Sequence, residues 1–185
     1  IVRSRFWSLP NHGPAEFGDE IALRNSLRRE LEEAVRRRSP PATAVGAFLS
    51  GGVDSSLVVA LACRLHEQPV HTYSVSFGAD YPNELAFSSL VARHCSTRHR
   101  IVEVPPAAVM QCFDATIAML SKPIGDPLTV PNAILFKEAA SDVRVVLNGE
   151  GGDPCFGGPK NLPMLLAELF GDGANRGCTD RYIRE

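Results

Sequence analysis

Ser50-Gly51-Gly52-Val53-Asp54-Ser55-Ser56 joins an apolar run, residues 45–49, to a helical pattern that begins at residue 55. The junction predicts a strand, a glycine-rich loop and a helix in that order. The first turn of a helix leaves backbone N–H groups without partners, and the helix dipole favours an anion there. The glycines let the backbone approach the anion closely, and the serine hydroxyls add hydrogen-bond donors. The stretch therefore predicts a phosphate-binding loop at the carboxyl end of a strand.

Asp54 indicates which kind of phosphate ligand the loop binds. A Walker-type loop carries a lysine for the β- and γ-phosphates of a nucleotide, and this loop has none. A bare carboxylate repels phosphate, so Asp54 suits a site with a bridging Mg²⁺. We interpret the loop as one that binds a whole diphosphate group. The alternative is an ordinary glycine turn whose serine and aspartate cap the helix.

Strand-like and helix-like runs alternate along the chain. The pattern predicts strands over residues 45–49, 70–77, 99–104 and 143–148, and helices over residues 20–38, 55–66, 84–94, 107–120 and 131–141. This alternation predicts an α/β fold, a mainly parallel sheet with helices on both faces. Such sheets bind ligands at the carboxyl ends of their strands, which is where the loop at Ser50 begins.

A second glycine-rich loop follows the last predicted strand. Residues 149–158 read Gly-Glu-Gly-Gly-Asp-Pro-Cys-Phe-Gly-Gly. Glu150 and Asp153 could complete a magnesium site that faces Asp54 across the pocket. The alternative is a flexible acidic loop. Together the two loops predict two walls of one nucleotide site.

Composition excludes several classes of protein. The 185 residues are expected to form one main domain, and the 44% of hydrophobic residues suffices for a sizeable core. A net charge of −2 gives no global basic field of the kind that attracts nucleic acid. The five cysteines include no Cys-x-x-Cys pair, which fits a reducing cytoplasm. No membrane-length apolar run is visible. We expect neither nucleic acid nor a membrane as a partner.

At this point the chain resembles a known family. The Ser50 loop is similar to the diphosphate loop (PP-loop) of the ATP pyrophosphatases, which release AMP and diphosphate and include asparagine, GMP and NAD synthetases. Residues 149–158 resemble the signature of asparagine synthetase-type domains, which GMP and NAD synthetases do not share. The resemblance runs from about Arg5 to Gly158 and implies an adenine nucleotide α-hydrolase-like fold.

The resemblance implies roles for particular residues. Asp54 and Asp153 would hold Mg²⁺, and together with Glu150 they would be the catalytic residues. Asp126 and Glu150 would face the amino group of the substrate. ATP would be bound by Leu49, Ser50, Gly51, Gly52, Asp54, Ser55, Ser56, Val75, Asn148 and Gly149.

The implied function is that of an ATP-dependent, AMP- and diphosphate-forming carbon–nitrogen ligase. A carboxylate attacks the α-phosphorus of ATP, and an amine then displaces AMP from the acyl-adenylate. Aspartate and ammonia are the expected substrates, asparagine is the expected product, and a glutaminase domain or subunit is an expected partner. Two alternatives stay open: a specialised relative such as a β-lactam synthetase or lasso-peptide cyclase, and a non-catalytic nucleotide-binding module.

Two positions depart from the family pattern. Pro154 stands where a second acid is usual, and Lys122 stands where many members have an acid. Both departures favour the specialised relative slightly. The family also has a late catalytic lysine in a helical region, and Lys160 is the only nearby candidate for it.

The expected organisation has three parts. Residues 1–18 should be coil, residues 19–160 the asparagine synthetase-like ATP-binding domain, and residues 161–185 a short helix and tail that begin a missing helical region. Nothing matches the family's N-terminal glutaminase domain. The chain begins with Ile1 and not with Met, which fits either a fragment or a processed form of a longer protein.

Overall fold

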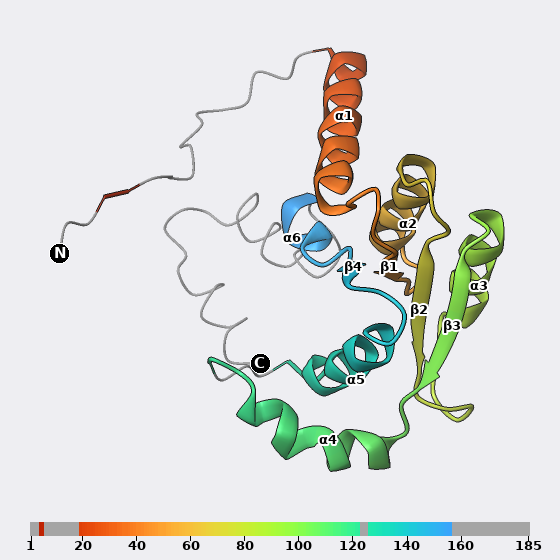
Figure 1. The fold of residues 1–185 in the computed structure, drawn as a ribbon, viewed down its shortest axis with the longest axis vertical. Helices are drawn as coiled ribbons and strands as arrows, with labels where there is room; N and C mark the ends of the chain where they lie inside the picture. The colour runs from red at the N-terminus through yellow and green to blue at the C-terminus, as the bar shows by residue number, and fades with distance from the viewer. Residues whose placement is uncertain (1–3, 6–18, 123–125, 157–185) are drawn as a thin grey trace, which may run out of the picture.

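A parallel sheet forms the centre of the protein (Figure 1). The structure is a computed structural model that describes residues 4–5, 19–122 and 126–156. The strands within these residues are β1 (Val45–Phe48), β2 (His71–Ser76), β3 (Arg98–Glu103) and β4 (Val145–Leu147). They lie in the order β3-β2-β1-β4, and each neighbouring pair is parallel. The predicted α/β fold with a parallel sheet is confirmed.

The helices of the described residues are α1 (Glu20–Arg38), α2 (Val53–Leu65), α3 (Leu85–His94), α4 (Pro106–Ala118), α5 (Thr129–Ala139) and α6 (Gly152–Phe156). The predicted boundaries of α1 to α5 differ from these by two residues or fewer. Residues 152–156 are predicted as part of a loop, but they form the helix α6. A proline is tolerated there because the N–H groups of a first helical turn lack intrahelical partners anyway.

Side-chain alternation along β1 divides the core into two layers. Val45 and Ala47 face the layer of α1, α2 and α3, where they pack with Val59 and Ala92. On the other face Tyr73 of β2 packs with Leu135 of α5, and α4 contacts α5. Figure 1 shows α3 and α5 on opposite sides of β2. The predicted placement of helices on both faces is thus confirmed.

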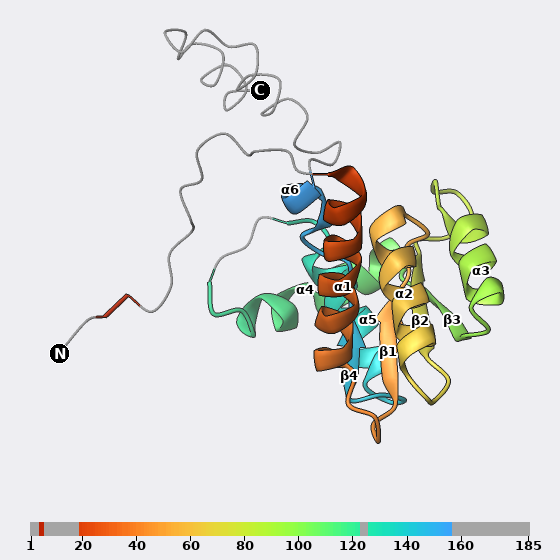
Figure 2. The same ribbon diagram turned by 90° about the horizontal axis from the view of Figure 1, so that it is seen from above.

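Local interactions explain α1 and its attachment. Asp19 caps the helix by accepting a hydrogen bond from the Ile21 N–H at 3.2 Å. Glu33 pairs with Arg37 at 2.8 Å on the exposed face. Glu32 pairs with Arg64 of α2, and the two helices lie side by side (Figures 1 and 2).

The path of the chain creates a switch point beside β1. From β1 the chain runs outward through α2 to β2 and through α3 to β3. It then crosses the opposite face through α4 and α5 and returns as β4 on the other side of β1. The loops after β1 and β4 therefore leave neighbouring strands at the same edge, where sheets of this kind bind ligands.

Some predictions concern residues that the structure does not describe. The predicted coil over 1–18 lies outside the described residues except for residues 4–5. Lys160 and the predicted short helix and tail over 161–185 lie outside them as well. Within the described residues, none of the helices has both the length and the apolar character of a membrane span.

Candidate functional site

Serine hydroxyls fold the loop after β1 onto the start of α2. The Oγ atoms of Ser50 and Ser55 lie 2.9 Å apart. Ser55 Oγ accepts a hydrogen bond from the Ser50 N–H at 3.2 Å and donates one to the Gly52 carbonyl at 3.2 Å. Ser50 Oγ in turn accepts from the Gly52 N–H at 3.3 Å. The loop is thus shaped before any ligand enters.

The N-terminus of α2 remains available to an anion. Gly52 is the N-cap residue, and no side chain caps this end of the helix by a hydrogen bond. The hydroxyl of Ser50 therefore holds the turn before α2 and does not cap the helix itself. Orphan N–H groups and the positive end of the helix dipole face the loop, which is an arrangement that binds phosphate.

Gly51 is required by both its conformation and its surroundings. Its φ of +97° lies in the left-handed region, which disfavours side chains. A Cβ atom at this position would lie 2.8 Å from the backbone nitrogen of Ser88 and 2.8 Å from Phe87 Cβ. The start of α3 therefore presses directly on the loop. The sequence analysis does not predict this contact.

The second loop lies against Asp54. A Cβ atom on Gly152 would fall 2.2 Å from Asp54 Oδ2, so only the bare glycine backbone admits the carboxylate there. A Cβ atom on Gly149 would lie 2.9 Å from the backbone carbon of Asp54 and 2.9 Å from the Ser55 nitrogen. The two glycine-rich loops are thus in contact, as expected for neighbours at a switch point.

The acidic residues of the second loop are neighbours in sequence of the glycines that lie against Asp54. Asn148 is exposed, and its Oδ1 accepts a hydrogen bond from the Glu150 N–H at 3.3 Å. Asp153 lies in the first turn of α6, directly after Gly152. Glu150 is exposed, whereas Asp54 and Asp153 are partly buried.

The residues fit a magnesium ion that is shared with a phosphate ligand. Within residues 4–5, 19–122 and 126–156, no group of three or more acidic, histidine or cysteine side chains could hold a metal ion. Mg²⁺ is usually bound by one or two carboxylates together with substrate phosphates, so a full cage of side chains is not needed. The Asp54 carboxylate, which lies against the Gly152 backbone, suits that role.

Leu49 directly follows β1, and Val75 lies in the neighbouring strand β2. Leu49 is 1% exposed, its N–H donates to the Tyr73 carbonyl at 2.9 Å, and its own carbonyl accepts from Ser74 Oγ. Val75 is partly buried against the core of the α5 face. The side chain of Val75 thus serves packing, and both polar backbone groups of Leu49 make hydrogen bonds within the protein.

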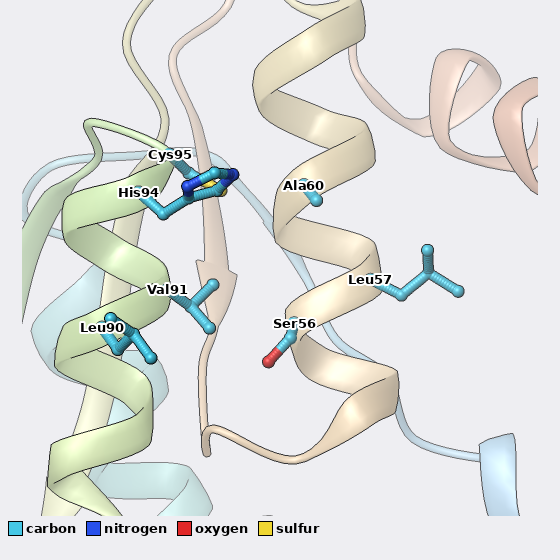
Figure 3. A pocket seen from close by; sticks show the side chains of 7 residues that line it. All are labelled: Ser56, Leu57, Ala60, Leu90, Val91, His94 and Cys95. Atoms are coloured by element: carbon cyan, nitrogen blue, oxygen red, sulfur yellow. The ribbon is translucent and has the colours of Figure 1, made fainter.

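Ser56 and Asp126 have different neighbours. Ser56 lines an open cavity of about 480 Å³ between α2 and α3, and its side chain faces α3 (Figure 3). That cavity is lined mainly by apolar side chains such as Leu90 and Val91, which do not suit diphosphate. Asp126 Oδ1 accepts a hydrogen bond from the Leu128 N–H at 2.8 Å, just before α5. Its carboxylate thus stabilises the turn that leads into α5.

Burial displaces the pKa values of three groups that are not part of the two loops. Burial, together with the neighbouring Cys95 thiol, raises the pKa of Cys63 to about 11. Burial and a hydrogen bond to Asp142 raise the pKa of Tyr73. Burial lowers the pKa of His99. These shifts belong to the helix and sheet interior.

Sequence reasoning missed Ser74, which is 3% exposed and holds the backbone directly before the loop. One signal could have found it. Thr72, Ser74 and Ser76 alternate along β2 and give polar side chains to one face of a strand that is otherwise buried. A buried hydroxyl needs a hydrogen-bond partner, which makes such a residue a candidate for a structural contact.

Comparisons with known proteins agree with the two motifs. The family model described as asparagine synthase matches residues 26–170. Asparagine synthetase [glutamine-hydrolyzing] 1 of Bacillus subtilis is 30% identical over an alignment 193 residues long, which covers 89% of this chain and 30% of the relative. A putative asparagine synthetase 2 of Methanocaldococcus jannaschii is 32% identical over 85% of this chain and 30% of its own length.

Another relative is named for a different activity. The carboxyethyl-arginine beta-lactam-synthase of Streptomyces clavuligerus is 31% identical over 85% of this chain and 30% of the relative. The chain spans 22% of the length of the putative asparagine synthetase of Mycobacterium bovis, and 30% of the length of the other relatives named above.

A solved structure agrees with the fold class. The U34-tRNA thiolase NcsA of Methanococcus maripaludis matches with a TM-score of 0.51 and 16% identity, covering 80% of this chain and 57% of the thiolase. An NH3-dependent NAD synthetase of Campylobacter jejuni matches with a TM-score of 0.45 and 17% identity, covering 66% of this chain and 54% of that protein. The first likeness supports the predicted α/β fold.

Proposed function

Because the chain belongs to the asparagine synthase family, we propose that it forms the ATP-binding part of an amide ligase that releases AMP and diphosphate. One observation carries the proposal: the loop after β1 and the loop after β4 meet at Asp54, Gly149 and Gly152. Their contact joins an uncapped helix N-terminus to acidic side chains at one edge of the sheet. The site therefore offers both phosphate donors and groups for a divalent cation.

In the proposed reaction the protein holds ATP so that its diphosphate can leave. The hydroxyls of Ser50 and Ser55 and the N–H groups at the start of α2 bind the diphosphate oxygens. A substrate carboxylate oxygen forms a bond to the α-phosphorus as the bond to the diphosphate breaks. An amine then forms a bond to the acyl carbon, AMP leaves, and the amine gives up a proton.

Acidic residues assist these steps in the proposal. Asp54 and Asp153 would hold Mg²⁺, which when bound neutralises charge on the leaving diphosphate. Glu150 and Asp126 orient the amino group of the substrate. Catalysis then consists mainly of positioning and of stabilising charge.

We propose aspartate and ammonia as the first substrates to test, with a glutaminase domain or subunit as the source of ammonia. Residues 19–160 form the ATP-binding domain in this proposal, and its setting is the cytoplasm. A specialised carboxylate is the second candidate. The similarity to a beta-lactam-synthase supports it, as do the exposed Lys122 and the proline at position 154.

The test is ATP–diphosphate exchange by the full chain with a panel of carboxylates, in the presence and absence of Mg²⁺. Exchange that requires aspartate supports the first candidate, and exchange that requires another acid supports the second. Asp54→Asn serves as the control for the site and should reduce exchange with every acid. ATP binding without exchange for any acid would contradict both enzymatic candidates for this chain and favour a nucleotide-binding module.

A further inference from the structure

One peptide unit leads from the sheet into the diphosphate loop, and both of its polar ends are held. Its carbonyl belongs to Leu49 and accepts a hydrogen bond from Ser74 Oγ on the neighbouring strand β2. Its N–H belongs to Ser50 and donates to Ser55 Oγ at 3.2 Å. A hydrogen bond at each end fixes the rotation of this peptide plane, and thereby the direction in which the chain enters the loop.

Ser74 makes a contact that the sheet itself does not supply. Strand β1 ends at Phe48, and the last backbone hydrogen bond from this segment to β2 runs from the Leu49 N–H to the Tyr73 carbonyl at 2.9 Å. Beyond this point the chain turns toward α2, so the side chain of Ser74 binds the next carbonyl. Leu49 is 1% and Ser74 3% exposed, which leaves little access for water to replace that hydroxyl.

The orientation of this peptide unit affects the groups that would bind the phosphate. The N–H of Ser50 and the hydroxyls of Ser50 and Ser55 form one hydrogen-bonded set with the Gly52 backbone. If the peptide before Ser50 rotates, this set loses its common geometry. If the loop adopts several orientations, only one of them binds the ligand. The apparent affinity then falls in proportion to the fraction of molecules in that orientation.

We propose that Ser74 is a positioning residue for the diphosphate loop and sets its affinity without touching the ligand. The proposal rests on the diphosphate-binding role proposed above. It adds that the buried hydroxyl on β2 holds the loop in its binding geometry.

The experiment compares Ser74→Ala with a matched control, Thr72→Val. Thr72 lies on the same face of β2 and is fully buried, and its hydroxyl contacts Thr97 Oγ1 at 2.7 Å and His99 Nδ1 at 2.9 Å. Each variant loses one buried hydroxyl from the same strand, so each should lose stability. Only Ser74→Ala removes a contact of the loop.

Two readouts separate positioning from general destabilisation. The first is amide hydrogen exchange of residues 50–55 in the unliganded full chain, measured relative to the exchange of β2. The second is the affinity for inorganic diphosphate with Mg²⁺, measured by calorimetry well below the unfolding temperature of each variant. We expect Ser74→Ala to raise exchange in the loop and to weaken binding by about threefold to tenfold, since a single hydrogen bond makes a modest net contribution.

Ser74→Thr keeps the hydroxyl and should restore both readouts. Thr72→Val should show exchange in the loop and affinity close to those of the wild type. Equal effects of Ser74→Ala and Thr72→Val, or loop exchange unchanged by Ser74→Ala, would overturn the proposal. If the wild-type chain binds no diphosphate, the proposed function fails, and the exchange measurement still decides whether Ser74 orders the loop.

Discussion

Gly152→Ala tests the contact between the two loops most directly. The added Cβ would fall 2.2 Å from Asp54 Oδ2 and 2.4 Å from its Cγ, both far inside van der Waals contact. These atoms end a short, rotatable side chain, so the carboxylate can swing aside. The substitution should therefore displace the carboxylate that we propose as a magnesium ligand and leave the surrounding backbone in place.

The expected change in stability is small because two effects oppose each other. Alanine in place of glycine favours the helical conformation of α6 by up to about 1 kcal/mol. Forcing Asp54 off its preferred rotamer costs about 0.5–1.5 kcal/mol. The free energy of unfolding should thus change by less than about 1 kcal/mol, which is a shift of only a few degrees in Tm. Thermal unfolding followed by circular dichroism measures this change.

The affinity for Mg²⁺ and diphosphate should fall at least about tenfold, because even indirect disturbance of a metal ligand usually costs that much. Calorimetry with inorganic diphosphate and Mg²⁺ measures the loss. Asp54→Asn should weaken binding by itself, and the double variant Asp54→Asn/Gly152→Ala should bind no more weakly than the weaker single variant. Such non-additivity shows that Gly152 acts through Asp54.

Gly151→Ala is the matched control. A Cβ atom there would meet nothing within 4 Å, but the φ of +94° disfavours any side chain. This variant should lose about 1–2 kcal/mol of stability while keeping its affinity for diphosphate. The reasoning is refuted if Gly152→Ala binds diphosphate like the wild type while Asp54→Asn does not, or if their effects simply add.

Three further predictions concern other parts of the structure. Gly149→Ala should lower the free energy of unfolding by about 2 kcal/mol or more in urea titrations, because its Cβ would meet the backbone of Asp54 and Ser55 at 2.9 Å and backbone cannot swing aside. Cys63, whose pKa is raised to about 11, should react with iodoacetamide far more slowly than the exposed Cys155 at pH 8 and faster as the pH approaches 11, by peptide mass spectrometry. Equal labelling at pH 8 would contradict that burial. Burial lowers the pKa of His99 below its ordinary value near 6.5. As the pH falls, His99 is therefore protonated in the unfolded chain before it is protonated in the folded chain. Stability should therefore fall as the pH drops below about 6.5, and the wild type should lose more than His99→Gln over that range.

Local patterns predicted most of the secondary structure. The helix over residues 20–38 was predicted with its observed boundaries, because charged pairs, a basic last turn and a following pair of prolines all mark it locally. The strand–loop–helix order at residues 45–65 was also predicted, because an apolar run, two adjacent glycines and a helical pattern follow one another in the sequence. Helix α6 was not predicted, because five residues with a glycine and a proline give no helical periodicity.

The sequence by itself determined the types of chemical group in the site and the edge of the sheet at which they lie. Glycines, serines and aspartates directly after predicted parallel strands predict a phosphate loop, and strand direction alone places those loops at one edge. The tertiary structure decided which of them touch. The contact of Gly152 with Asp54 and the hydrogen bond from Ser74 to Leu49, which lies 25 residues away, depend on the order of the strands and on how closely their backbones pack. Hydrophobic periodicity records which face of an element is buried, and it carries no information about the neighbour against which that face packs.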